Sequence, residues 1–112
     1  MMNAFFLDTQ TPWEDVGGGI KRKIIGYTDE IMAVHVCFAK GAVGAVHYHE
    51  EHDQIAFVGA GSFEVTVGDE VKVLKAGDAY TAAKYVKHGA VSLEDDSVLI
   101  DMFSPLRAEF LQ

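Results

Sequence analysis

Short apolar runs recur along the chain between residues 20 and 103, and Gly, Asp, Glu or Lys separates most of them. The runs are rich in Val, Ile, Phe and Tyr, which favour strands over helices. In order they read IKRKIIGY, EIMAVHVCFA, QIAFVG, SFEVTVG, EVKVLKAG, AYTAA, GAVSL and SVLIDMF. No window of a dozen residues carries a helical stripe, apart from a short turn expected in PLRAEFLQ. Many short strands with regular turn signals predict an all-β protein, an antiparallel sandwich or barrel.

The turns and the N-terminal segment refine this picture. The stretch FEVTVGDEVKVL alternates on both sides of GDE, which predicts a hairpin with a tight turn at Gly68 and Asp69. Residues 1–19 are expected to form an N-terminal arm or an edge strand, with Trp13 as a candidate anchor. The KRK run at residues 21–23 is expected on an edge strand, where charges discourage unwanted pairing. The length of 112 residues predicts a single domain, 1–112.

Composition and charge narrow the function classes. Hydrophobic residues make up 49% of the chain and charged residues 23%, values typical of a globular protein. The net charge of −8 disfavours nucleic acid and anionic membranes as partners, because both attract a basic surface. The single cysteine, Cys37, excludes an intrachain disulfide and a Cys-rich zinc site. No apolar run approaches the about 20 residues that span a bilayer, and the start lacks signal-peptide features, so a cytoplasmic location is expected.

The stretch HYHEEHDQ, residues 47–54, concentrates three of the five histidines. Alternate side chains of a strand face the same side, so His47 and His49 would project together, with Cα atoms about 7 Å apart. A turn at EEHD would let Gln54 swing back towards the same pocket, and the fold could bring His88 close. Imidazoles with an amide oxygen suit Fe(II), Mn(II), Ni(II) or Zn(II). The alternative interpretation is a polar loop that is rich in histidine by chance.

The end of the chain places polar groups where a core should be apolar. In SVLIDMFSPLR, both faces of the expected strand are otherwise apolar, so Asp101 would lie among buried neighbours. A buried carboxylate must be paired, protonated or functional, and it could serve as a general acid or base. The alternative is that Asp101 caps a turn or pairs with a lysine. Arg107 follows a Ser-Pro turn and could bind a carboxylate at the pocket rim, or else remain solvated.

Two spacings in the chain resemble the motifs of the cupin superfamily. Gly41, His47, His49, Gln54 and Gly61 follow the spacing of the first motif, with Gln in place of the usual Glu and a four-residue spacer before it. The second motif is matched in spacing from Gly77 to His88, with Ala83 and Tyr85 where the family has Pro and Gly. The resemblance covers roughly residues 30–105. It implies a double-stranded β-helix, or jelly-roll barrel, that holds one divalent metal through His47, His49, Gln54 and His88.

The exchange of Glu for Gln has two interpretations. A neutral amide leaves more positive charge on the divalent ion, which makes it a stronger Lewis acid for an anionic or carbonyl ligand. The opposite interpretation is a weakened, decayed site. All three histidine spacings of the motifs are intact, which favours a working site.

Longer stretches resemble the pectin-degradation cupins of KdgF type, which open 4,5-unsaturated uronate monosaccharides from pectin or alginate to linear keto acids. Asp101, Phe103, Pro105 and Arg107 match the D-x-F-x-P-x-R-like tail of that family, and Gln54 matches its ligand set. The resemblance implies that Asp101 and Arg107 are catalytic and that Phe103 and Arg107 bind substrate. The stretch AAKYVKH departs from the family's Pro-rich segment, so substrate identity is less firmly implied than metal binding.

Two other functions remain open at this stage. Cupins with three histidine ligands also include metal-dependent dioxygenases, and a non-catalytic sugar-binding module is the third candidate. His35 and Cys37 are expected on an outer or interface face, and His52 at the pocket rim. A sheet that leaves apolar surface exposed predicts a homodimer. The expected ligand is a small anionic sugar acid.

Overall fold

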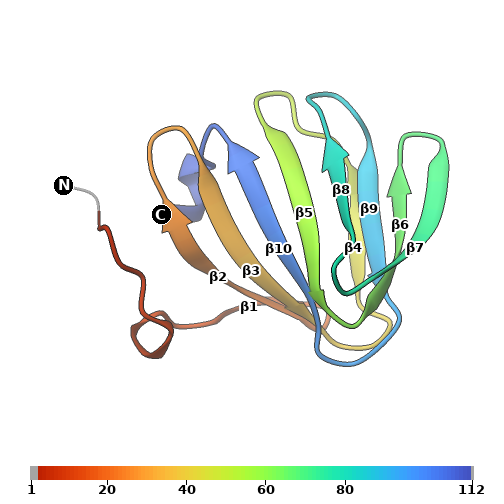
Figure 1. The fold of residues 1–112 in the computed structure, drawn as a ribbon, viewed down its shortest axis with the longest axis horizontal. Coiled ribbons are helices and arrows are strands. Elements are labelled where there is room, and N and C mark those ends of the chain that lie inside the picture. The colour runs from red at the N-terminus through yellow and green to blue at the C-terminus, as the bar shows by residue number, and fades with distance from the viewer. Residues whose placement is uncertain (1–2, 112) are drawn as a thin grey trace.

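The computed structural model describes residues 3–111 and contains ten strands in two antiparallel sheets (Figure 1). One sheet has six strands in the order β1-β2-β3-β10-β5-β8, and the other has four in the order β4-β9-β6-β7. The strands are β1 (Glu14–Gly17), β2 (Ile20–Tyr27), β3 (Met32–Phe38), β4 (Val43–His47), β5 (Asp53–Ala60), β6 (Ser62–Val67), β7 (Glu70–Lys75), β8 (Ala79–Ala82), β9 (His88–Ser92) and β10 (Ser97–Ser104). The all-β jelly-roll class predicted from the sequence is confirmed.

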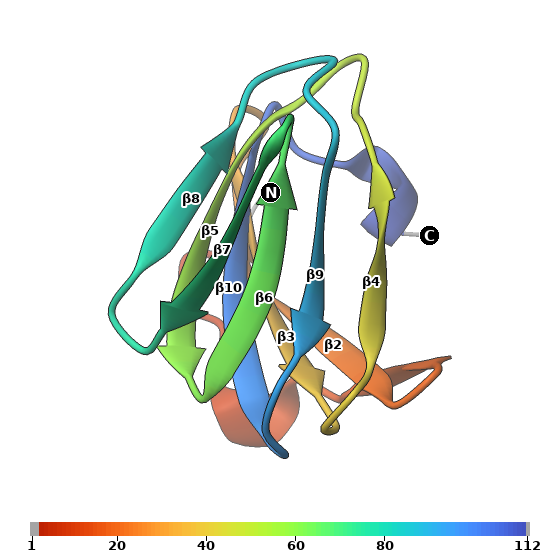
Figure 2. The same ribbon diagram turned by 90° about the vertical axis from the view of Figure 1, so that its right-hand side faces the viewer.

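The core lies between the two sheets, which face each other in Figure 2. Along β3, the residues Met32, Val34, Val36 and Phe38 are buried, while Ala33, His35 and Cys37 between them are only half-buried. This alternation is the period of two that a strand imposes on its side chains. The rings of Phe38 and Phe63 meet edge to face, with their centroids 5.0 Å apart, and join the two sheets. His35 and Cys37 therefore lie on the outer face, as predicted.

The predicted hairpin is confirmed, because β6 and β7 pair with Val67 opposite Glu70 across Gly68 and Asp69. Gly61 shows why a motif glycine is needed between β5 and β6. Its φ is +72°, and a Cβ built there would lie 2.1 Å from Ser97 Oγ. The short turn expected in PLRAEFLQ is also present, as the 3-10 helix η2 (Ala108–Leu111).

The N-terminal segment corrects one expectation. The 3-10 helix η1 (Asp8–Gln10) precedes β1, and β1 forms the outer strand of the six-stranded sheet. The KRK run lies on β2, between β1 and β3, so its placement on an edge strand was wrong. The reason is that residues 14–17, although exposed, pair with residues 20–22 of β2 and so form the edge themselves. Lys23 of β2 is buried and forms an ion pair with Asp8.

Trp13 holds the N-terminal arm against the sheet. The ammonium groups of Lys21 and Lys23 lie 4.7 and 4.5 Å from the centre of its ring, and His35 meets it edge to face at 5.0 Å.

Within residues 3–111, no helix is both long and apolar enough to cross a membrane.

Candidate metal centre

Three histidines converge inside one end of the barrel. His47, the last residue of β4, lies opposite His88, the first residue of β9, so the pairing of these strands brings the two imidazoles together. His49 lies beyond the end of β4 rather than within it, yet its Nε2 is only 3.2 Å from His47 Nε2. One ligand atom from each of the three side chains falls within 4.8 Å of the others. This spacing would let all three reach one cation.

Hydrogen bonds to backbone carbonyls orient two of these rings. His47 Nδ1 lies 2.7 Å from the Ala45 carbonyl oxygen, and His88 Nδ1 lies 3.0 Å from that of Val86. A carbonyl can only accept, so each Nδ1 carries the proton and each Nε2 keeps its lone pair. Among the described residues, the buried His88 Nε2 has no hydrogen-bond partner. His88 Nε2 therefore presents a free lone pair to the cavity, and the lone pair of His47 Nε2 faces His49 Nε2.

Gln54 and Asp101 reach the same cavity from the facing sheet. Gln54 of β5 pairs in register with Phe103 of β10, and Asp101 lies two residues before Phe103 on the same face of the strand. Gln54 Oε1 and Asp101 Oδ1 are also buried without a hydrogen-bond partner in residues 3–111. Orphaned buried acceptors are rare because each costs about 1–3 kcal/mol. Together with His88 Nε2 they fit a site that binds a cation or a proton donor.

Burial keeps two of the three histidines, His49 and His88, neutral. Desolvation, followed by the positive charge of Arg107 and the neighbouring imidazoles, lowers the pKa of His49 to about 4. Burial likewise lowers the pKa of His88, and the charges of His47 and Arg107 add to the effect. Neutral imidazoles are the metal-binding form. The ligand chemistry expected from the sequence is therefore available at neutral pH.

The pKa of Asp101 shifts in the opposite direction, upward. Desolvation raises the pKa of this carboxyl to about 7, although the Gln54 amide and the Arg107 charge oppose the rise. The Asp101 residue is partly exposed, but its Oδ1 is shielded from solvent. The environment of this buried oxygen sets the pKa of the carboxyl. A carboxyl with this pKa can both hold and release a proton near neutrality.

Arg107 lies just beyond the end of β10 and lines the same cavity. Its guanidinium lies 5.0 Å from the centre of the Phe103 ring, and its Nε donates to Glu109 Oε1 at 2.9 Å. The structure thus brings all seven predicted site residues to one cavity: His47, His49, Gln54, His88, Asp101, Phe103 and Arg107.

The sequence did not point to three further lining residues. Tyr80 is half-buried, and desolvation and the charge of Asp101 raise its pKa. Arg22 reaches the cavity from the KRK run, and Phe110 reaches it from η2. Period two along β2 places Arg22 on the face opposite its two lysine neighbours, and this is the one sequence signal that could have identified it.

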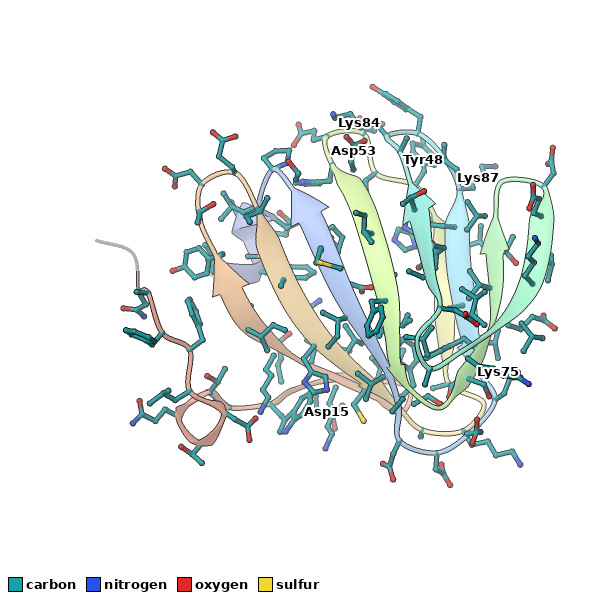
Figure 3. All side chains as sticks on the ribbon, viewed as in Figure 1. Asp15, Tyr48, Asp53, Lys75, Lys84 and Lys87 are labelled. Carbon is teal, nitrogen blue, oxygen red and sulfur yellow. The ribbon has the colours of Figure 1, made fainter. Side chains whose placement is uncertain are left out.

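The loops at the rim also hold the site. His52 Nδ1 lies 2.8 Å from the Pro105 carbonyl oxygen, outside the three-histidine cluster, in agreement with its predicted rim position. Tyr85 occupies a left-handed conformation with φ +67°, and its amide donates to the His49 carbonyl at 2.8 Å. Figure 3 shows Tyr48, which lies between two candidate ligands, at this loop end with Asp53, Lys84 and Lys87.

A larger hollow of about 680 Å³ lies on the other side of the six-stranded sheet, between the arm and the outer face. Its lining is mainly apolar and includes Phe6, Ile25, Ile55 and Met102. The three clustered histidines are absent from the described residues that line it, so we assign the chemistry to the smaller cavity of about 180 Å³.

Comparison with known proteins gives consistent matches. The family described as a cupin domain matches residues 34–103. The pectin degradation protein KdgF of Dickeya dadantii (strain 3937) is 60% identical over 110 residues, covering 98% of this chain and all of that protein. The structure of KdgF from Halomonas sp. aligns with a TM-score of 0.93 and 48% identity, covering 96% of this chain and 98% of that one. The structure of an RmlC-like cupin from Shewanella frigidimarina NCIMB 400 aligns with a TM-score of 0.91 and 45% identity, covering 96% of each chain.

Proposed function

Because this chain belongs to the cupin domain family, and within it to the KdgF-type pectin-degradation proteins, we propose that it opens 4,5-unsaturated uronate monosaccharides to linear keto acids. One observation carries the proposal. The three clustered histidines face a buried carboxyl and an arginine across a single small cavity. Such a set can bind an anionic sugar acid and move a proton on it.

The cavity residues would hold one divalent transition metal. Its ligands would be His47, His49, His88 and Gln54, which suit Ni, Zn, Mn or Fe by their donor atoms. The orphaned Nε2 of His88 and Oε1 of Gln54 support this assignment. When bound, the metal supplies a Lewis acid that stabilises negative charge on the substrate.

The reaction is an isomerisation, and its atoms balance within the substrate. The anomeric hydroxyl loses a proton, the bond between C1 and the ring oxygen breaks, and C4 gains a proton. Asp101 would carry the proton from the hydroxyl to C4, which its pKa of about 7 permits at neutral pH. Arg107 would bind the uronate carboxylate, and Phe103 would pack against the sugar ring.

Metal removal tests this function directly. The loss of absorbance of the conjugated unsaturated uronate would be followed with purified protein, with protein treated with a chelator, and with chelated protein reloaded with each candidate metal. We expect acceleration that is lost on chelation and restored by at least one metal. Ring opening that is equally fast after complete metal removal would contradict the proposal. Oxygen uptake with a thiol or diketone substrate, without ring opening, would instead support the dioxygenase alternative.

We also propose that two copies pair through the outer face of the six-stranded sheet. Ile25, Ile55 and Phe57 are exposed there beside the apolar hollow, a surface that a second copy would cover. Light scattering should give a dimer, and a monomer at all concentrations would contradict the pairing. The cytoplasmic location stays a prediction from the sequence.

A further inference from the structure

We propose that Phe110 sets the size limit of the cavity, so that a single uronate ring enters while a disaccharide carrying the same unsaturated ring is excluded. The inference rests on the proposed function, because it names the residue that selects the substrate of that site. It starts from η2, a segment whose role in the site the sequence did not predict.

The size of the cavity provides the first support. Its volume is about 180 Å³, equal to roughly six water molecules at about 30 Å³ each. Pockets for larger, drug-sized ligands span about 300–1,000 Å³. The cavity therefore suits one sugar ring and not two linked rings.

The second support is the position of η2. In Figure 2 the C-terminal turn lies on the same side of the six-stranded sheet as β4. Phe110 lines the cavity from this turn, together with Arg22 of β2 and Arg107. The ring thus forms part of the cavity wall, next to side chains of β2 and of the segment after β10.

Contacts on several sides hold the Phe110 ring. The guanidinium carbons of Arg22 and Arg107 lie 4.0 and 4.2 Å from the ring centre, and the Phe103 ring meets it edge to face with centroids 6.0 Å apart. Cation–π contacts and edge-to-face ring contacts of this kind are attractive and restrict the position of the ring.

Acidic partners fix both arginines in turn. The NH2 group of Arg22 donates to Glu14 Oε1 at 2.8 Å, and Arg107 Nε donates to Glu109 Oε1 at 2.9 Å. These contacts hold the Phe110 ring in one position in the cavity wall.

The proposed reaction explains why a disaccharide should be excluded from the cavity. Ring opening needs a free anomeric hydroxyl, but in an unsaturated disaccharide that oxygen forms the glycosidic bond. A bound disaccharide could not react and would only block the site. A wall at Phe110 would keep out this precursor and leave the cavity to the monosaccharide that a glycoside-cleaving reaction releases from it.

Binding of an unsaturated digalacturonate tests the wall without relying on turnover. Calorimetric titrations would compare metal-loaded wild type, Phe110→Ala, Phe110→Leu and Leu111→Ala, with galacturonate as the single-ring probe. Leu111 belongs to the same turn but is not among the residues that line the cavity, so Leu111→Ala is the matched control. We expect Phe110→Ala to tighten disaccharide binding at least about tenfold relative to wild type, with the Leu variant between them and the control unchanged.

Disaccharide binding as tight in wild type as in Phe110→Ala would overturn the inference, and so would the absence of binding to every variant. If Phe110→Ala does not fold, the inference is tested by comparing disaccharide binding of Phe110→Leu with that of wild type. If wild type does not open the monosaccharide, the proposed function is wrong. The size limit is still tested in that case, because the titrations measure binding and not turnover.

Discussion

The two ends of the barrel interior are built from the same strands but carry opposite chemistry. At one end Phe38 and Phe63 pack edge to face, and Leu99 is buried with them. At the other end β9 begins with His88 and β5 carries Gln54 near its first residue. The change occurs along single strands, because two residues after Leu99 on β10 the same face carries Asp101.

This comparison separates stability from function within one small domain. Apolar burial stabilises the fold at the Phe63 end. At the histidine end, three buried acceptors have no hydrogen-bond partner in residues 3–111, so this end destabilises the isolated chain. Substitutions at the two ends should therefore have opposite consequences for stability and for ligand binding.

The largest expected effect is on stability, at the apolar end. Phe63→Ala removes a fully buried ring and should lower the free energy of unfolding by about 3–5 kcal/mol, because it leaves a cavity. Urea unfolding measures the change, and Phe5→Ala, at a ring that is 82% exposed, is the matched control. A loss below about 1 kcal/mol would mean that this end is not the stabilising one.

A change at the histidine end should affect the metal instead. His88→Ala removes one candidate ligand and should weaken metal affinity at least about 100-fold, since even changes to groups that only orient ligands cost 10–100-fold. Metal titration monitored by competition with a chelator measures this. His35→Ala, on the outer face of β3, should leave affinity unchanged. Equal affinity in both variants would contradict the assignment of His88.

Asp101→Asn should stabilise the metal-free protein at neutral and higher pH. The pKa of Asp101 is raised from 3.8 to about 7 on folding, so the folded chain binds the extra proton between these values and its ionised form is destabilising above pH 7. The gain should reach at most about 4 kcal/mol above pH 7 and vanish below pH 4.

Unfolding of wild type and Asp101→Asn across this pH range measures the difference, in which the shared histidine titrations cancel. The exposed Asp69→Asn serves as the control. A difference that does not change with pH would exclude a raised pKa.

The smallest expected effect is at the rim. Tyr85 has φ +67°, a conformation that costs a non-glycine residue about 1–2 kcal/mol and that Asn tolerates better. Tyr85→Asn should therefore raise the free energy of unfolding by up to about 1 kcal/mol. Tyr48→Asn, at a position without a positive φ, should give no gain, and thermal melts compare the two. Destabilisation by Tyr85→Asn would show that its side chain contributes more than its backbone strain costs.

Local patterns in the sequence predicted much of this molecule. Alternation along residues 62–75 predicted the hairpin, and the spacing of His47 and His49 suggested that their side chains converge. The spacing alone did not reveal that β4 ends at His47, because the end depends on pairing with β9.

Placements that depend on tertiary contacts could not be predicted in this way. Arg22 lines the cavity because β2 turns this face of the strand towards the other sheet, which depends on its pairing with β3. Phe110 becomes part of the wall only because η2 folds back between two arginines that are 85 residues apart in the chain, at positions 22 and 107. The placement of Phe110 leaves no period or motif in the sequence, and for Arg22 period two along β2 gives only the face of the strand.

The most direct test of the central claim is the rate of ring opening by metal-loaded Asp101→Asn. Asparagine keeps the shape of the side chain but cannot carry a proton, and the three histidines and Gln54 stay unchanged. The account predicts one equivalent of metal per chain, as in wild type, with ring opening reduced at least about 100-fold. Full ring-opening activity in a variant that retains its metal would contradict the assignment of Asp101 as the group that moves the proton.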